Sequence, residues 1–503
     1  MQLPAPRCIV IEMRCWFGVA VFVFGCNGST QPAPAPPILS PGPPPGAAPA
    51  APANPVPFPA GTGDIGAAGP TLPLAIARDG GWVALCQARA DTDGVPGIEV
   101  TSGYHGELGG DAMLPYFIRG GGLGVQIEQL ITVSDDTKRV AFTRKGALEI
   151  FDAATGTTVA LPDADLRGRR ALGGPSTLSF SADGRLAVYF RPRGEGASVI
   201  VRDLTAGTER EVVLPKGTPW AVEPDPTGPW ARLYALVDDT DGDGKVTPPQ
   251  VRTNRAHDTA CTGPAVSYST YGMTGDRPKE MWLRLDTGQV ISNENLLRPI
   301  GDKMLTRAGD GAIYVDKELV IPSDCKAAVT GVLVDPLRVL AACDGPAREL
   351  PVESFGKGVR LKTPAIRNGA DRGPIDILTS PFHCTPRDGC FDARDGAVVD
   401  LHDKDYRSRR GDVLLLTKDE GFAILDLSTN AYRAFDKTEV NGFGERHILA
   451  GDALVELATG KTIGKLPAEL FAIDDTGRGL QPAKLAPGSM PVGPLRWVSP
   501  IGE

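Results

Sequence analysis

Histidine is scarce in this sequence, with five residues in 503, and none stands at a recognisable spacing from a serine or cysteine nucleophile. The sequence contains no Gly-x-Ser-x-Gly, no His-Glu-x-x-His and no complete phosphate loop. The Gly-Lys-Thr at 460–462 lacks its leading glycine, because Val455 occupies that position. These absences exclude the common signatures of hydrolases, metalloproteases and nucleotide-binding proteins, and they favour a binding protein over an enzyme.

Long apolar runs and sustained helical periods are also missing. An uncharged apolar run extends from Cys15 to Phe24, preceded by Arg14 and followed by Gly25-Cys26. It is too short for a membrane-spanning helix, which needs about 20 residues. A basic residue followed by such a run is typical of a secretory signal peptide, which is removed after export.

The end of this run resembles the signal of bacterial lipoproteins, in which a Leu or Val, a small residue and Gly or Ala precede the lipidated cysteine. Val23-Phe24-Gly25-Cys26 matches this pattern except at the bulky Phe24. The resemblance implies a signal peptide over residues 1–25 and lipidation of Cys26, which becomes the mature N-terminus. Because the acidic Glu12 does not suit a basic signal start, we expect translation to begin at Met13.

Proline and alanine dominate the next segment, residues 26–71. It has 13 prolines between Pro32 and Pro59, and its first charged residue is Asp64. Such a composition cannot bury a core and predicts disorder. Since proline-rich chain extends at ~3.1 Å per residue, the segment can act as a tether that holds a domain up to roughly 90 Å from a lipid anchor.

Residues 72–503 have a globular composition and form the expected folded domain. The net charge is −9 and the isoelectric point is near 5.3. Two short basic clusters, at 167–170 and 407–410, are isolated from each other. An acidic chain with only scattered basic clusters is not expected to bind nucleic acid.

Repetition is the strongest internal signal. Five segments share an alternating apolar run that ends in an acid, with Gly or Asn four positions later. The pairs are Asp152 and Gly156, Asp203 and Gly207, Asp392 and Gly396, Asp426 and Asn430, and Glu456 and Gly460. Alternation predicts a half-buried strand, and Gly or Asn supplies the positive φ of a hairpin turn. Successive hairpins predict an all-β fold.

These repeats resemble known propeller families. "FSADGRLAVYF" (180–190) and "ITVSDDTKRVAF" (131–142) are similar to the repeats of TolB-type and WD-repeat-like bacterial propellers. "FDAATGTTV" (151–159) and "ELATGKTIG" (456–464) resemble the Thr-Gly repeats of quinoprotein-like propellers. The resemblance implies a β-propeller over residues 72–503, for which we expect seven or eight blades.

The stretch "LVDDTDGDGKVTPPQ" (236–250) places acids at alternate positions before a glycine. Calcium needs six to eight oxygen ligands, and this spacing matches the first half of an EF-hand-like loop. The candidate ligands are Asp239, Asp241, Asp243, the carbonyl of Lys245, and Thr247. Gln250 stands where the closing Glu of an EF-hand would be, so binding requires an acid from elsewhere. The alternative is a polar turn without metal.

The same loop occurs earlier in the chain. The correspondences are Trp230 with Trp82, Asp239 and Asp241 with Asp91 and Asp93, and Gly275-Asp276 with Gly110-Asp111. Val95 replaces the third acid in the first copy, which predicts a plain turn there. The second copy is longer, and its insertion is expected to protrude from one rim of the propeller.

Six cysteines remain after the signal peptide and Cys26. An even number in an exported chain predicts disulfides. Proximity in sequence favours Cys384 with Cys390 and Cys325 with Cys343, which leaves Cys86 for Cys261. The alternative is a zinc site formed by His383, Cys384, Cys390 and His402, which would need thiolates that an oxidising compartment removes.

Together these features predict a lipid-anchored binding or scaffold module of the bacterial envelope. Its expected partner is a protein or an envelope component, its membrane contact is the lipid anchor alone, and its expected location is the outer membrane, either on its periplasmic face or at the cell surface. The alternative function is a calcium-dependent propeller hydrolase that acts on a lactone, a phosphate ester or a glycan. The two differ in whether acids converge on the central channel.

The anchor can be tested by changing Cys26→Ser. The hydroxyl cannot accept the lipid, so we expect the variant to lose lipid labelling and to leave the membrane fraction of cells. Membrane fractionation and labelling with a lipid precursor measure this outcome. Unchanged fractionation together with unchanged labelling would contradict lipidation at Cys26.

Overall fold

The computed structural model describes residues 56–57, 60–65, 71–88, 113–122, 124–165, 177–194, 196–225, 228–247, 250–251, 273–274, 276–325, 328–343, 351–356, 359–367, 375–378, 380–385, 389–417, 421–436, 440–444, 446–467, 470, 472–484 and 492–501. Within these ranges, no helix combines the length and the apolar character needed to cross a membrane. The signal peptide and Cys26 lie outside the described residues.

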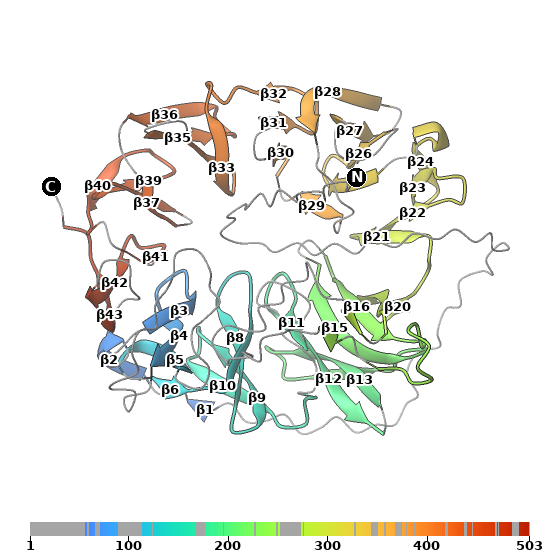
Figure 1. Ribbon diagram of the computed structural model, residues 1–503, viewed down its shortest axis with the longest axis horizontal. Coiled ribbons are helices and arrows are strands. Elements are labelled where there is room, and N and C mark those ends of the chain that lie inside the picture. Colours follow the sequence, from blue (N-terminus) through green and yellow to red (C-terminus); the bar gives the residue numbers. More distant parts are fainter. Residues whose placement is uncertain are drawn as a thin grey trace, which may run out of the picture.

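The described chain is a ring of antiparallel sheets, each a blade of a propeller (Figure 1). The first five blades are built as follows. Blade 1 contains β3 (Thr71–Ile76), β4 (Trp82–Ala88), β5 (Met113–Gly122) and β6 (Val125–Gln126); blade 2, β7 (Gln129–Val133), β8 (Arg139–Arg144), β9 (Ala147–Asp152) and β10 (Thr157–Leu161); blade 3, β11 (Leu178–Phe180), β12 (Leu186–Arg193), β13 (Gly196–Asp203) and β14 (Glu209–Val212); blade 4, β15 (Thr218–Pro224), β16 (Trp230–Leu236), β19 (Lys279–Arg284) and β20 (Val290–Ile291); blade 5, β21 (Leu296–Ile300), β22 (Lys303–Arg307), β23 (Ile313–Val315) and β24 (Glu318–Ile321).

The second half of the ring follows the short 3-10 helix η2 (Ser323–Cys325). Blade 6 contains β25 (Ala328–Leu333), β26 (Arg338–Ala342), β27 (Pro351–Gly356) and β28 (Val359–Arg367); blade 7, β30 (Phe382–Thr385), β31 (Gly389–Asp392) and β32 (Val398–Val399), preceded by β29 (Asp376–Leu378); blade 8, β33 (Asp405–Arg410), β34 (Val413–Thr417), β35 (Gly421–Asp426) and β36 (Ala431–Asp436); blade 9, β37 (Val440–Phe443), β38 (His447–Ala450), β39 (Ala453–Glu456) and β40 (Thr462–Lys465); blade 10, β41 (Ala472–Ile473), β42 (Gly479–Lys484) and β43 (Val492–Val498).

The expectation of an all-β propeller is confirmed, but the count of seven or eight blades is wrong, because the described strands form ten. The count failed where blades lack the acid-to-glycine repeat. In blade 5, for example, the turn between β23 and β24 places Asp316, not Gly, at a positive φ of 55°. At roughly 40–45 residues for a four-stranded blade, a domain of this length can hold ten.

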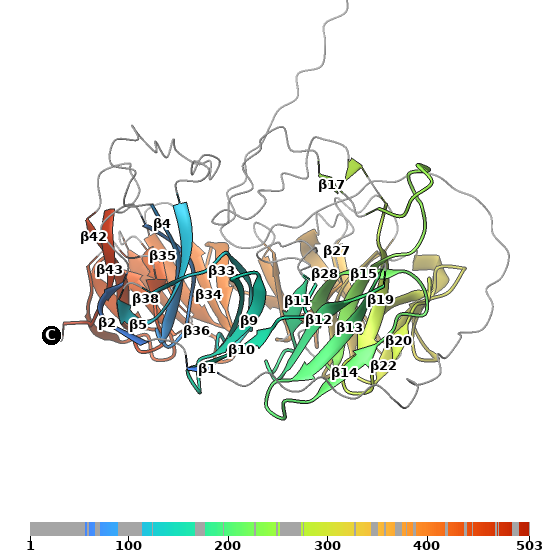
Figure 2. The same cartoon turned by 90° about the horizontal axis from the view of Figure 1, so that it is seen from below.

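Two strands from the proline-rich segment pair with the blades, and the second of them closes the ring. β1 (Val56–Pro57) pairs with β10, and β2 (Ala60–Ile65) lies between β5 of the first blade and β43 of the last. Figure 2 shows β2 next to β43 and β5, at the edge of the ring where the C-terminus also lies. The described strands therefore include residues before 72, and part of the segment that its composition predicts to be disordered is strand.

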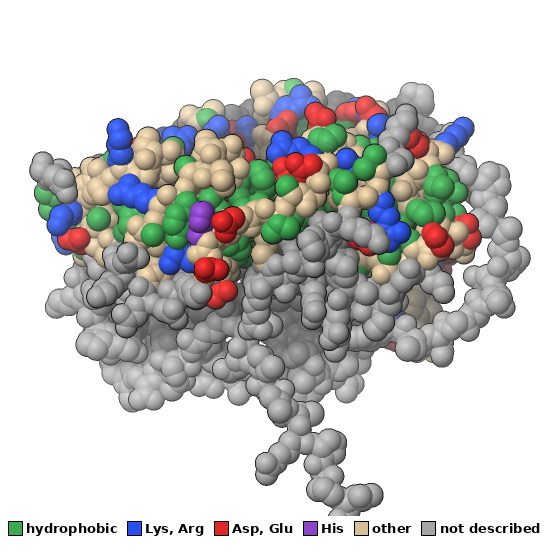
Figure 3. All heavy atoms as spheres, turned by 90° about the horizontal axis from the view of Figure 1, so that it is seen from above, with side chains coloured by type: hydrophobic (Ala, Val, Ile, Leu, Met, Phe, Trp, Pro, Cys, Tyr) green, Lys and Arg blue, Asp and Glu red, His purple; other side chains and the backbone are tan. Residues whose placement is uncertain are grey.

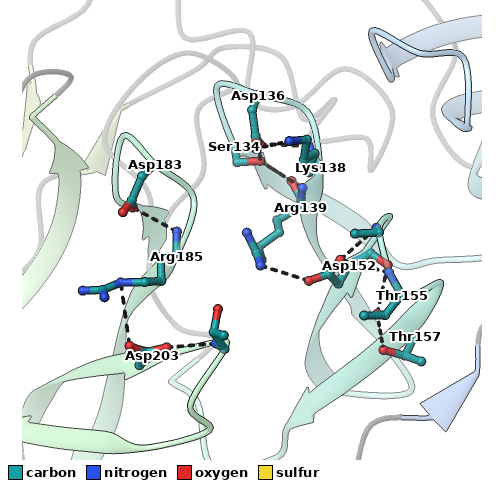
Figure 4. Close-up of polar contacts among 12 residues, drawn as sticks. Ser134, Asp136, Lys138, Arg139, Asp152, Thr155, Thr157, Asp183, Arg185 and Asp203 are labelled. Carbon is teal, nitrogen blue, oxygen red and sulfur yellow. Dashed lines mark hydrogen bonds and ion pairs between the residues drawn. The ribbon is translucent and has the colours of Figure 1, made fainter.

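The acid-to-glycine repeat works as a turn clamp (Figure 4). The Asp152 carboxylate accepts the backbone N–H groups of Ala154 and Thr155, while Gly156, at a φ of 68°, donates its N–H to the Asp152 carbonyl. Asp203 and its turn repeat this pattern in blade 3. The acid thus satisfies turn N–H groups that the sheet leaves without partners.

A second clamp holds the preceding turn of the same blades. Ser134 Oγ donates to Asp136 at 2.6 Å and accepts the N–H of Arg139, and Ser181 does the same with Asp183 and Leu186. The Arg139 side chain then reaches Asp152 at 3.0 Å, which joins the two clamps (Figure 4). These contacts explain the Ser-x-Asp pattern by local hydrogen bonding, with no ligand required.

Apolar side chains fill the spaces between blades. Described clusters join blades 1 and 2, 2 and 3, 3 and 4, 5 and 6, 6 and 7, 7 and 8, 8 and 9, 9 and 10, and 10 and 1. The last of them packs Val83 and Leu85 of blade 1 against Leu480 and Leu495 of blade 10, so the ring is closed by a continuous core as well as by β2.

The described residues also place polar contacts between blades 4 and 5. Arg298 of β21 pairs with Asp225 at 2.7 Å, and both side chains are almost fully buried. The Trp282 ring lies between two guanidinium groups, with Arg298 at 5.6 Å and Arg232 at 5.2 Å from its centroid. Since a buried charge is costly without its partner, this interface depends on the ion pair remaining intact.

Disulfides join Cys325 to Cys343 and Cys384 to Cys390, as their proximity in sequence predicts. Cys86 is also disulfide-bonded, and its expected partner Cys261 lies outside the described residues. The thiols of Cys384 and Cys390 are consumed by their bond, so the zinc alternative does not apply to this structure.

Replacing Arg298→Met should show how much the polar interface matters. The change leaves the Asp225 carboxylate buried without its cation, and we expect a loss of about 3–5 kcal/mol of folding free energy. The control is Arg193→Met, because Arg193 forms an exposed pair with Glu211 at 3.3 Å, and such pairs contribute less than about 1 kcal/mol. Denaturant unfolding of both variants measures the difference, and equal losses would contradict this account.

Candidate metal centre

The candidate site is at one end of blade 4. The chain leaves β16 at Leu236, runs through the acidic loop, forms the ribbon of β17 (Gln250–Val251) and β18 (Met273–Thr274), and re-enters the blade at β19. Figure 2 shows β17 beyond the ends of β15 and β19, away from the body of the blade. The insertion expected from the sequence therefore begins and ends at this loop.

Three carboxylates come together there: Asp239, Asp241 and Asp276. One oxygen of each lies within 4.8 Å of the others; Asp239 and Asp241 are exposed, and Asp276 is buried. Oxygens that share one calcium ion at 2.3–2.6 Å are separated by at most about 5 Å. The group can therefore bind a metal ion, with water and backbone carbonyls completing the coordination.

Asp276 forms hydrogen bonds with several backbone groups of the loop. Its Oδ1 accepts the N–H and the hydroxyl of Thr240 and the N–H of Asp241, while its Oδ2 accepts the N–H of Thr247 at 2.6 Å. The backbone hydrogen bonds from Thr240 and Thr247 hold the pKa of Asp276 below its usual value. This carboxylate is therefore ionised at neutral pH and is fixed in position before any metal arrives.

Asp239 shapes the first bend of the loop. Its two oxygens accept the N–H groups of Gly242 at 2.6 Å and of Gly244 at 2.8 Å. Both glycines have positive φ, 79° and 83°, which a residue with a side chain rarely adopts. The alternating acids and glycines in the sequence thus bring the carboxylates together in a tight turn.

Asp243, another candidate ligand, is not one of the three grouped carboxylates. Asp243 accepts the N–H of Lys245 at 2.8 Å and so caps its own turn. Thr247 contacts the group through its backbone, because its N–H binds Asp276 and its carbonyl accepts the N–H of Asp276. The structure thus groups two of the three acids of the loop with a third from the far end of the insertion.

Asp238 lies beside the group but is already neutralised. Lys216 and Lys279 each donate to it at 2.6 Å. These two hydrogen bonds lower the pKa of Asp238 to about 2. Its carboxylate therefore forms ion pairs with the two lysines at the base of the loop and is not one of the candidate metal ligands.

The sequence of the acidic loop does not identify Asp276 as a candidate ligand, because 35 positions separate Asp276 from Asp241. The sequence did contain a signal. Gly275-Asp276 corresponds to Gly110-Asp111 of the first copy of the loop, so an acid recurs where the chain returns to the blade. Residues 91–111 of that first copy lie outside the described residues.

No family model and no curated protein matches this sequence. Among solved structures, a TolB of Agrobacterium tumefaciens matches at 14% identity and a TM-score of 0.24, over 45% of this chain and 66% of that chain. Dipeptidyl peptidase 4 of Porphyromonas gingivalis matches at 11% identity and a TM-score of 0.34, over 72% of this chain and 52% of that chain. Oligogalacturonate lyase of Vibrio parahaemolyticus matches at 10% identity and a TM-score of 0.24, over 66% of this chain and 85% of that chain.

The chain spans about half to two thirds of the first two proteins. Similarity at this level is distant and says nothing about activity or partners. The described fold is a β-propeller, which is the architecture that the TolB-type repeats imply.

Calcium binding can be tested by changing one charge. Asp241→Asn keeps the size of the side chain and its acceptor oxygen for the N–H of Asp243 but removes a carboxylate from the group. Free calcium at ~100 times its dissociation constant should stabilise the wild type by about 2.7 kcal/mol, and the variant should lose this response. Thermal melts in calcium and in chelator measure it.

The matched control is Asp243→Asn, which makes the same change in the same loop but outside the group. It should keep the calcium response. A wild-type melt that is indifferent to millimolar calcium and to chelator would show that the loop is only a turn.

Proposed function

We propose that this protein is a non-enzymatic binding module of the bacterial cell envelope. In this proposal a lipid at Cys26 holds the propeller near a membrane, and the rim of blade 4 binds a protein or another envelope component. The observation that supports it most is the acidic group at the base of the β17–β18 ribbon, where a calcium ion would control the position of the ribbon.

A bound ion would connect the two ends of the insertion that carries the ribbon. Asp239 and Asp241 lie at the start of the insertion and Asp276 lies at its end. An ion bound by all three carboxylates holds the two ends together and restricts the insertion before a partner binds. The insertion then loses less conformational entropy on binding. Without the ion, two exposed carboxylates repel each other and the buried one. Calcium would therefore favour the binding-competent arrangement of the ribbon.

Export is supported by the cysteines. Two disulfides and a fifth disulfide-bonded cysteine, Cys86, are typical of an oxidising compartment. On the face shown in Figure 3, acidic, basic and apolar side chains are interspersed, and neither sign of charge dominates. A mixed surface of this kind suits a protein partner better than a polyanion.

A photo-crosslinking residue in place of Val251, in β17, tests the proposal in cells. We expect a discrete crosslinked product that disappears in chelator and in the Asp241→Asn background, and that persists in the Asp243→Asn background. The same residue in place of Val213 on blade 3, whose exposed fraction is 57%, serves as a control for random contact. Products at Val213 but not at Val251 would place the binding surface elsewhere.

A further inference from the structure

Blade 7 is an incomplete blade in the described part of the chain. It has three strands, and β32 is only two residues long. β29, which precedes β30 in the chain at the position of an innermost strand, pairs in parallel with β25 of blade 6. Among the described strands, no innermost strand of another blade pairs with a neighbouring blade in this way. Blade 7 is therefore held largely by contacts from its neighbours.

His383 of β30 lies on the side of blade 7 that faces blade 6. It is directly opposite Phe391 of β31, and the two rings are 5.5 Å apart. Phe391 belongs to an apolar cluster with Leu333 and Leu340 of blade 6. Because side chains alternate along a strand, the neighbouring Phe382 packs on the opposite side, against the cluster shared with blade 8.

The His383 ring is poorly placed to carry a proton. Its Nε2 is buried and, among the described residues, has no hydrogen-bond partner. Burial and, to a smaller degree, the Arg409 guanidinium lower its pKa to about 4, from 6.5 when it is exposed. A neutral ring suits this apolar interface, whereas a protonated ring would bring an unpaired charge into it.

The other charged groups nearby are already paired. Arg409 reaches from β33 to donate to the carbonyl of Phe382, and its guanidinium contacts Asp412 at 3.1 Å. On β31, Asp392 is paired with Arg394, whose carbonyl accepts from Arg338 of blade 6. Among the described residues, no acid pairs with the His383 imidazole, so protonation gains no compensating contact.

We propose that blade 7 is an acid-sensitive segment of the ring, which separates from blade 6 when His383 takes up a proton. The separation moves the ring from an apolar interface into water, where it can be protonated. It leaves the Cys384–Cys390 disulfide intact, so β30 and β31 stay joined and move as one hairpin.

The direction and size of the effect follow from proton linkage. Above pH 6.5 the ring is neutral in both the closed and the open blade, and pH has no effect through it. Between pH 6.5 and about 4 the open blade binds a proton and the closed blade does not. The opening equilibrium should therefore rise by at most about tenfold for each pH unit in that window.

Hydrogen exchange of the intact protein, followed by mass spectrometry from pH 7.5 to 4.5, measures this opening. After correction for intrinsic exchange rates, peptides from β30 and β31 should lose protection as pH falls. His383→Phe keeps an aromatic ring beside Phe391 without a titrating nitrogen and should remove this pH dependence. The control His402→Gln removes a partly exposed histidine near blade 7, next to Asp400 at 3.7 Å, and should keep it.

The proposal is overturned if the His383→Phe variant loses protection with pH as the wild type does. If that variant does not fold, exchange of the imidazole C2 hydrogen in the wild type gives the pKa of His383 directly. A value well below 6.5 supports the proposal, and a value near 6.5 refutes it. Neither measurement depends on the calcium site, so this result is separate from that of the proposed function.

Discussion

Every blade of this protein has two faces that must be covered, and that requirement determines the ring. A sheet with two apolar faces cannot stop at a free end, so the first and last blades must meet. Val83 and Leu480 do so in the core, and β2 does so at the edge by pairing with both β5 and β43. Closure also uses chain from the proline-rich segment, because β2 is formed by residues 60–65.

Several polar side chains in this structure satisfy groups that the strand pairing of the blades leaves without a partner. The acid of each turn clamp supplies acceptors for N–H groups beyond the sheet, and Asp225 and Arg298 satisfy each other between blades 4 and 5. Trp82 and Trp230 show the same logic, since each donates its indole N–H to a turn carbonyl of the next blade, at 2.8 Å and 2.7 Å. Their alignment in sequence thus reflects one shared role.

The local pattern was readable because its physics is local. An acid with a glycine four positions later, as at Asp152 and Gly156, specifies one turn through contacts within that turn. The number of blades was not readable, because it depends on strand pairing between segments that share no motif, such as β21 to β24. Asp276 was recognisable as a recurring residue but not as a partner of Asp241, since only the folded blade brings the two ends of the insertion together.

The two blades with proposed roles are those that depart most from the repeat. Blade 4 interrupts its hairpin with an insertion, and blade 7 has its innermost strand paired with the neighbouring blade. Motion is least costly where the contacts that hold a segment are fewest. A ligand or a proton can shift an equilibrium only where two states differ in affinity for it, and the carboxylates near Asp276 and the buried ring of His383 each provide such a difference.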